Sequence, residues 1–397
     1  MEYNFNKIID RAGTDSAKWD AKQSDQDPNI HVRTDLFSGK NPAIPMWIAD
    51  MDFAPPKEVV DALTARAKHG LYGYTESSPT YAASVVDWMR TRRRWAIQPN
   101  WIVTTPGVVP ALAMLVKTFL KPGDKAIIQT PVYFPFYLVL EVNGIEVVKN
   151  PLRYEDGRYQ MDFDDLAKKT RDPKTKMLIL CSPHNPVGRV WTRAELTRLH
   201  EICRANNVMV ISDEIHADLT FTRFTPYGNI DKTAIVCTAA SKTFNLAGLL
   251  TSNIILPVKE QREAFQKYLL SNALVDTSIF GALATQTAYR HGADWLDQLL
   301  VYLSGTLDYM EKYLAKHIPQ IRMIRPEGTY LVWLDCHALG MDAKSLHKFF
   351  RDEARVYFEQ GAIFGTEGEG FMRMNIATPR KRVKEALKRM KEAIKSR

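Results

Sequence analysis

Ser241-Lys242-Thr243-Phe244-Asn245-Leu246-Ala247-Gly248 is the stretch that decides the fold of this chain, together with Ser212-Asp213-Glu214-Ile215-His216 upstream. Lys242 stands in otherwise apolar surroundings, although an unpaired ammonium is costly to bury. Burial and cationic neighbours lower the pKa of a lysine, and its free amine is then a nucleophile toward an aldehyde. Taken alone, Lys242 would be interpreted as a solvated loop lysine.

The upstream stretch changes that interpretation, because Asp213 ends an apolar run. An acid at one strand end can hold a protonated pyridine nitrogen, while a lysine at another strand end forms a Schiff base with the aldehyde on the same ring. The two residues together predict pyridoxal 5'-phosphate (PLP) as the cofactor.

Short apolar runs alternate with helical patterns through the middle of the chain, for example a helix expected at residues 193–206. This alternation is typical of an α/β domain with a mostly parallel sheet, whose ligands bind beyond the carboxyl ends of the strands. Asn185, Asp213 and Lys242 each follow an expected strand, so three strands should deliver them to one crevice. Six strands are expected, at residues 125–129, 145–149, 177–181, 208–212, 234–238 and 252–256.

The pattern changes near residue 294. Helices are expected at 294–317 and 343–354, and strands at 328–334 and 370–376, which together indicate a smaller α+β domain spanning residues 294–397. Residues 46–293 form the expected large domain. Residues 1–45 are irregular and are expected to pack on the small domain.

The composition of the 397 residues, 45% apolar and 25% charged, is ordinary for a globular protein. No apolar run approaches the length of a transmembrane helix, and the N-terminus lacks the order of a signal peptide. The cysteines form no CxxC pair and are interpreted as buried free thiols; they are Cys181, Cys203, Cys237 and Cys336. We therefore expect a cytoplasmic protein without a membrane or metal site.

Much of the net charge of +8 lies in residues 90–94 and in the tail, residues 380–397. Val383, Leu387 and Met390 recur in the tail at helical spacing, which predicts an amphipathic helix with a basic face. A nucleic-acid role for that face is an alternative, but a solvated face is the expectation.

Two loops have features of a cofactor site. Gly107 and Pro110 precede an apolar helix expected at residues 111–120, whose start could bind a phosphate. An ordinary turn that binds nothing is the alternative. In Pro131-Val132-Tyr133-Phe134-Pro135-Phe136, one ring could stack on a flat cofactor, whereas Phe134 and Phe136 are interpreted as packing residues.

Two further side chains are candidates for recognition. Asn185 could donate to the phenolic oxygen of a pyridoxal ring, although Asn-Pro is also a common turn dipeptide. Arg373 alternates with apolar residues, so it should face inward and need an anionic partner. Its planar fork suits the carboxylate of an amino acid, and a structural ion pair is the alternative.

Together these motifs resemble fold-type I PLP enzymes of the aspartate aminotransferase superfamily. The closer resemblance is to the MalY/PatB group of cystathionine β-lyases, and it runs from about Lys18 to the C-terminus. It implies an α/β fold with a mostly parallel seven-stranded sheet and a smaller α+β domain. The residues that carry it are 45–53 (Pro-Met-Trp-Ile-Ala-Asp-Met-Asp-Phe), 72–75, 131–136, 212–219, 240–248 and 373–375.

The resemblance implies a role for each matching residue. Lys242 would form the Schiff base, Asp213 would pair with the pyridine nitrogen, and Tyr133 would stack on the ring. Asn185 would contact the phenolic oxygen and the substrate carboxylate, which Arg373 would bind.

The same resemblance places the backbone of Val108 and Val109, after Gly107, at the phosphate, and Ala49 at the substrate. Tyr74 would reach the phosphate of a neighbouring subunit, so the active sites of a homodimer would be shared. Tyr72 is the fallback for that role.

Three positions depart from the wider aminotransferase pattern, which has tyrosine where this chain has His216 and often serine and arginine where it has Ala239 and Leu250. Phosphate anchoring should therefore depend on backbone dipoles, Ser241 and the neighbour's tyrosine. His216 could contact the ring or could be a packed histidine.

The implied activity is β-elimination from cystathionine or related cysteine S-conjugates, which yields a thiol, pyruvate and ammonia. An aminotransferase would use the same residues and is the first alternative. A regulatory interaction role alongside the enzyme is the second. No nucleic-acid partner is expected.

Overall fold

The structure is a computed structural model that describes residues 2–20, 36–76 and 78–397. It contains two compact units. The larger comprises Ala54–Asp297 with Glu327–Thr329, and the smaller comprises Met1–Phe53, Gln298–Pro326 and Tyr330–Arg397. The chain passes from one unit to the other at Phe53/Ala54 and Asp297/Gln298, eight and four residues after the boundaries expected from the sequence.

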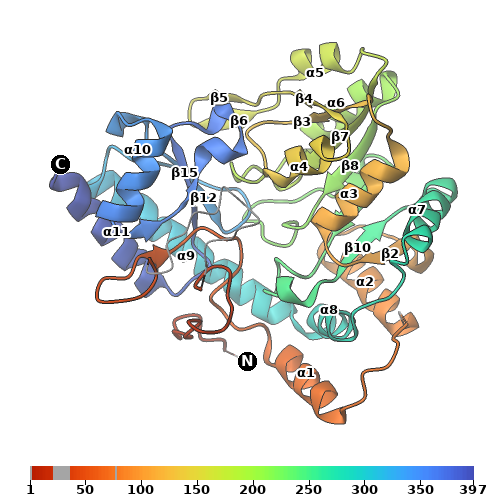
Figure 1. The fold of residues 1–397 in the computed structure, drawn as a ribbon, viewed down its shortest axis with the longest axis horizontal. Coiled ribbons are helices and arrows are strands. Elements are labelled where there is room, and N and C mark those ends of the chain that lie inside the picture. Colours follow the sequence, from red (N-terminus) through yellow and green to blue (C-terminus); the bar gives the residue numbers. More distant parts are fainter. Residues whose placement is uncertain (1, 21–35, 77) are drawn as a thin grey trace. The chain divides into compact units, whose positions relative to one another are not determined.

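A seven-stranded sheet forms the centre of the larger unit, in the order β2-β10-β9-β8-β7-β3-β4 (Figure 1). Only β10 runs antiparallel to its neighbours, so the expectation of a mostly parallel seven-stranded sheet is confirmed. The strands are β2 (Ile102–Thr105), β3 (Lys125–Ile128), β4 (Glu146–Lys149), β7 (Thr175–Cys181), β8 (Met209–Asp213), β9 (Ile235–Thr238) and β10 (Ser252–Ile255).

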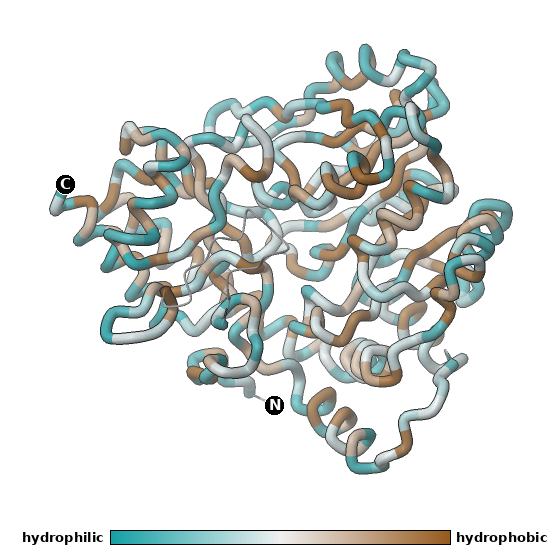
Figure 2. Tube along the Cα trace, viewed as in Figure 1, coloured by the Kyte–Doolittle hydropathy of each residue, from teal (hydrophilic) through white to brown (hydrophobic). Residues whose placement is uncertain are grey.

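Helices cover this sheet, and the sheet's strands carry many of the hydrophobic stretches visible in Figure 2. Alternate strand residues such as Ile128, Ile179 and Ile211 form one core with α3, α4 and α7, so the residues between them face the other side.

A capping box between Thr192 and Glu195 starts α6 where the sequence predicts a helix. The helices are α1 (Lys57–His69), α2 (Pro79–Arg92), α3 (Val108–Phe119), α4 (Pro135–Glu141), α5 (Phe163–Lys169), α6 (Arg193–Ala205), α7 (Lys259–Ser271) and α8 (Ile279–His291). A hairpin of β5 (Arg153–Glu155) and β6 (Arg158–Gln160) completes this unit.

The smaller unit contains a four-stranded antiparallel sheet, in the order β11-β12-β15-β14. Its strands are β11 (Arg322–Ile324), β12 (Leu331–Asp335), β14 (Glu359–Gln360) and β15 (Phe371–Asn375). The short β1 (Ile44–Pro45) pairs in parallel with β13 (Val356–Tyr357). The helices are α9 (Ala293–His317), whose first five residues belong to the larger unit, α10 (Ala343–Lys348), continued by a π-helical turn, and α11 (Arg380–Lys395).

Helix α11 has the amphipathic character predicted for the tail, because Val383, Leu387 and Met390 are buried. Among its basic side chains, Arg382 pairs with Asp52 and Arg389 pairs with Glu385. All four cysteines are buried free thiols. Within the described ranges, no helix combines the length and apolar character needed to cross a bilayer.

Candidate active site

Six strands of the larger unit end at the same edge of the sheet, because β4 is also parallel to β3, and five of them are followed by candidate residues. Strands β3, β7, β8 and β9 are parallel, and β2 shares their direction because β10 is antiparallel to both β2 and β9. Cys181 pairs with Asp213 and Asp213 with Cys237, so β7, β8 and β9 end nearly level. The ends of these five strands and the segments that follow them carry Gly107, Val108, Val109, Tyr133, Asn185, Asp213, His216, Ser241 and Lys242.

Asp213 is the last residue of β8 and is only 4% exposed. Its side chain lies on the α3 face of the sheet, because Ile211, two residues earlier, packs in that core. Burial raises the pKa of Asp213 to about 7, against the opposing effects of the Ile215 N–H and the charge of Lys242. A buried acid of this kind would hold a cationic ring nitrogen.

Lys242 lies four residues after the end of β9, in a half-buried turn. The turn is closed by the N–H of Phe244, which donates to Ala240 O at 2.9 Å, and the N–H of Leu246, which donates to Ser241 O at 2.9 Å. The charge of Lys242 acts on the Asp213 carboxyl. The lysine and the acid of the sequence hypothesis therefore lie beyond and at the ends of neighbouring strands, within range of an electrostatic interaction.

A buried ion pair joins the segments that carry these two residues. The Asp218 carboxylate accepts two hydrogen bonds from Arg93, each of 2.9 Å, and one of 2.9 Å from the Thr243 hydroxyl. Arg93 also donates to the Thr238 hydroxyl at the end of β9, at 2.6 Å. Burial alone would raise the pKa of Asp218, but Arg93 and the other donors lower it.

Sequence reasoning missed this ion pair. Arg93 was seen only as part of the basic stretch 90–94, whereas its side chain is almost completely buried. Asp218 and Thr243 lie inside the matching segments 212–219 and 240–248. The available signal was Asp218 itself: an acid so close to Asp213 can be expected to be buried and therefore to need a cationic partner.

The loops after β3 and β7 are joined through their backbones. The N–H of Tyr133 donates to Asn185 O at 3.1 Å, and the N–H of Asn185 donates to Cys181 Sγ at 3.4 Å. Asn185 is buried and Tyr133 is half-buried. Phe136 belongs to the core, as its packing interpretation required, whereas Phe134 is 38% exposed.

Helix α3 starts at Val108, three residues before its expected start, with Gly107 as the N-cap residue. Pro110 lies in the first turn, where a missing N–H costs no intrahelical hydrogen bond. The N–H groups of Val108 and Val109 likewise have no acceptor within the helix, so they are suited to an anion.

His216 is buried in the turn after β8, where its backbone oxygen accepts a hydrogen bond of 2.9 Å from Leu219 N–H. Both interpretations of its ring stay open. Tyr74 is fully exposed. The Tyr72 hydroxyl, in contrast, donates to Ala67 O at 2.6 Å within its own chain.

The substrate candidates Arg373 and Ala49 belong to the smaller unit. Arg373 is buried in β15, donates to Trp47 O at 3.1 Å and lies 4.7 Å from the Phe364 ring centroid. If Arg373 serves a structural ion pair instead, its partner is Glu359, the cross-strand neighbour whose Oε2 lies 3.8 Å from Arg373 Nη2. Ala49 O accepts a 2.8 Å hydrogen bond from the Tyr330 hydroxyl. No group of metal-ligating side chains is present among the described residues.

This fold and sequence place the chain in a known family. The chain belongs to the class I and II aminotransferases, whose family profile matches residues 43–390. It is 40% identical to cystathionine β-lyase PatB of Bacillus subtilis (strain 168), over 97% of this chain and 100% of PatB. It is 31% identical to protein MalY of Escherichia coli (strain K12), over 97% of each chain.

The fold has close counterparts among solved structures. Cystalysin from Treponema denticola, whose crystal structure contains a pyridoxal 5'-phosphate cofactor, matches with a TM-score of 0.93 and 36% identity over 100% of both chains. The resemblance to the MalY/PatB group expected from the sequence is thus confirmed.

Proposed function

We propose that this protein is a PLP-dependent carbon–sulfur β-lyase that cleaves cystathionine or related cysteine S-conjugates to a thiol, pyruvate and ammonia. The observation that carries the proposal is the buried Asp213 at the end of β8, whose pKa is influenced by the charge of Lys242 in the turn after the neighbouring β9. The relatives named above add support, since PatB is a cystathionine β-lyase.

The residues at the strand ends fit PLP. The Asp213 carboxyl, in a buried position that favours its neutral form, would gain a cationic partner in the pyridine nitrogen. Lys242 would bind the aldehyde, the start of α3 and Ser241 would hold the phosphate, and Tyr133 would stack on the ring. Asn185 would donate to the phenolic oxygen. When bound, PLP supplies an electron sink for the bond cleaved at Cα.

The side chains of this chain perform the remaining steps. Arg373 binds the α-carboxylate with its planar fork, helped by Asn185, and so orients the substrate. The Lys242 amine removes the α-proton as a general base and can return a proton to the departing sulfur. The Asp213 carboxylate would hold the positive charge on the pyridine nitrogen. The thiol leaves from Cβ, and the remaining fragment hydrolyses to pyruvate and ammonia.

An aminotransferase is the second candidate, because the family name describes that chemistry. The two activities are separated by supplying cystathionine without any keto acid and measuring the products. Equal release of pyruvate, ammonia and homocysteine over many turnovers is expected. A requirement for an added keto acid, with the cofactor converted to its amine form, would establish the aminotransferase instead.

We also propose a cytoplasmic homodimer in which Tyr74 completes the partner's phosphate site. Large apolar side chains are exposed on the larger unit near the start of α8. The ring centroid of Tyr72 lies 5.8 Å from that of Phe280, and a Cβ on Gly281 would meet Leu249 O at 2.3 Å. The loop that contains Tyr72 and the loop that contains Leu249 therefore both lie beside the start of α8. Exposed apolar patches of this kind mark interaction surfaces. The exposed residues are Leu71, Tyr72, Tyr74, Leu250, Leu274 and Val275.

A further inference from the structure

Residues 46–51, which include the substrate candidate Ala49, follow β1 as irregular backbone. Each of their carbonyl oxygens nevertheless accepts a hydrogen bond from elsewhere in the smaller unit. Irregular backbone ordinarily leaves many such groups to water, so this segment is held unusually tightly. The donors, in order from Met46 to Met51, are Asn375 N at 2.8 Å, Arg373 Nη2 at 3.1 Å, Asn375 Nδ2 at 2.6 Å, the Tyr330 hydroxyl at 2.8 Å, Asn375 Nδ2 again at 2.6 Å and Arg11 Nη1 at 3.0 Å.

Asn375 is the centre of this arrangement. Its amide group donates to both Ile48 O and Asp50 O, and its Oδ1 accepts from Ala377 N–H at 2.8 Å. Because side chains two residues apart share a face of a strand, Arg373 and Asn375 project from the same face of β15. The arginine proposed to bind the carboxylate and the asparagine therefore hold the same segment.

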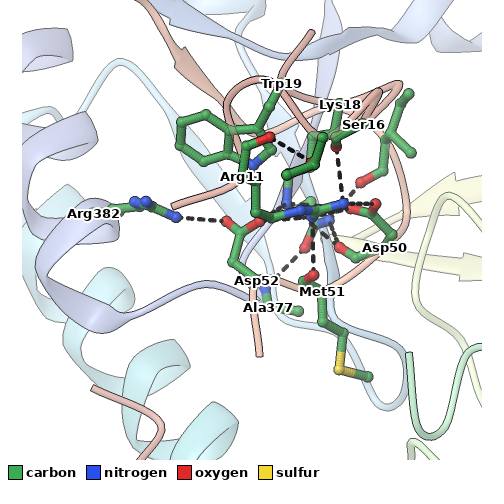
Figure 3. A network of polar contacts seen from close by, with 12 residues as sticks. Arg11, Ser16, Lys18, Trp19, Asp50, Met51, Asp52, Ala377 and Arg382 are labelled. Atoms are coloured by element: carbon green, nitrogen blue, oxygen red, sulfur yellow. Dashed lines mark hydrogen bonds and ion pairs between the residues drawn. The ribbon is translucent and has the colours of Figure 1, made fainter. Parts of the chain in front are cut away.

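An ionic cluster braces the far end of the segment (Figure 3). Arg11 lies between Asp50 and Asp52, with N–O distances of 2.6 and 2.9 Å. Lys18 and Arg382 approach Asp52 at 3.2 and 3.1 Å. Burial would raise the pKa of Asp52, but Lys18 and the other donors lower it to about 2, so the carboxylate stays charged.

We propose that Tyr330 and Asn375 are positioning residues that hold residues 46–51 in the shape needed to recognise the α-carboxylate of the substrate. The Tyr330 hydroxyl fixes Ala49, and the Asn375 amide fixes the peptide groups on either side of it. Arg373 is affected as well, because its guanidinium is bound to Trp47 O. The inference rests on the proposed function.

The test uses Tyr330→Phe, which removes a single oxygen, and Asn375→Ala. Both variants should raise KM for cystathionine about tenfold or more and change kcat by less than about threefold. Hydrogen exchange of residues 46–52 should become faster in both, with or without PLP. Asn150→Ala is the matched control, because Asn150 is also buried and its amide donates to Asp162 O and Asp165 in the larger unit. It should leave KM and the exchange of residues 46–52 unchanged.

The two measurements separate this inference from the proposed function. If the wild-type protein releases no pyruvate from cystathionine, the proposed lyase activity is wrong, and KM is then measured for the amino acid substrate of the transaminase reaction. Unchanged exchange of residues 46–52 in both variants would overturn the positioning role. Faster exchange with an unchanged KM would also overturn it, since the segment would then be held for stability alone.

Discussion

The Thr243 hydroxyl donates a 2.9 Å hydrogen bond to the Asp218 carboxylate, which also accepts two hydrogen bonds from Arg93. Thr243 directly follows Lys242, and Asp218 lies five residues after Asp213. One buried carboxylate therefore joins the turn that carries the proposed Schiff-base lysine to the turn that carries the proposed partner of the ring nitrogen.

Thr243→Val should weaken both stability and catalysis. Removing the hydroxyl deprives a buried carboxylate of one donor, which costs about 1–3 kcal/mol, and it frees the turn that positions Lys242. We expect a lower Tm and a kcat reduced about tenfold, measured by thermal denaturation and pyruvate release. Thr243→Ser retains the hydroxyl and should restore most of kcat. If the valine and serine variants have the same kcat, the hydrogen bond does not position Lys242.

Lys242→Ala should abolish turnover, because the chain then lacks both the proposed Schiff-base amine and the proposed general base. The variant can still bind PLP noncovalently. Borohydride reduction of the wild-type holoenzyme, followed by peptide mapping, should find the pyridoxyl group on Lys242. A label on any other lysine would contradict the assignment.

The contribution of Asp213 to the stability of the cofactor-free protein should be lost as the pH rises from about 4 to about 7. Burial raises the pKa of Asp213 from 3.8 to about 7, so the folded chain keeps a proton that the unfolded chain has lost. The associated stability is fully present below pH 3.8 and is lost as the pH rises through about 7. The effect is on the order of a few kcal/mol.

Urea denaturation of cofactor-free wild type and Asp213→Asn across this pH range checks that dependence. The stability of the wild type relative to the asparagine variant should fall as the pH rises. Other groups contribute to both proteins alike: burial raises the pKa of Glu214 to about 7, which lowers stability with rising pH, and burial lowers the pKa values of His184 and His347 to about 4, which has the opposite effect. Identical slopes would mean that Asp213 does not carry the effect. In the holoenzyme, Asp213→Asn should also lower kcat about 10²–10³-fold, which corresponds to a loss of several kcal/mol of transition-state stabilisation.

Tyr74 should serve the neighbouring subunit. Subunits carrying Tyr74→Phe are mixed with subunits carrying Lys242→Ala after mild unfolding. If the tyrosine acts across the interface, a heterodimer has one site with both lesions and one with neither, so activity should recover. Heterodimers that form but stay inactive would assign Tyr74 to its own chain.

Much of the larger unit could be predicted from the sequence, because a strand covered on both faces is a continuous apolar run. Six strands of the sheet overlap the expected ranges. Strand β2 was missed, since it is an edge strand of four residues in which buried and partly exposed positions alternate. The positions of Asn185, Asp213 and Lys242 after three adjacent strands were predictable for the same reason.

The sequence by itself determined the local features: the apolar runs, the amphipathic tail and the order of the loops that carry the candidate residues. Only the tertiary structure decided which distant groups meet. Arg93 and Asp218 are separated by 125 residues, and Asn375 holds a carbonyl 327 residues away. The tertiary structure alone also decided the raised pKa of Asp213, because that pKa depends on burial. Such contacts leave no periodic signal in the chain, because they depend on the packing of side chains from separate elements rather than on the spacing of residues along one element.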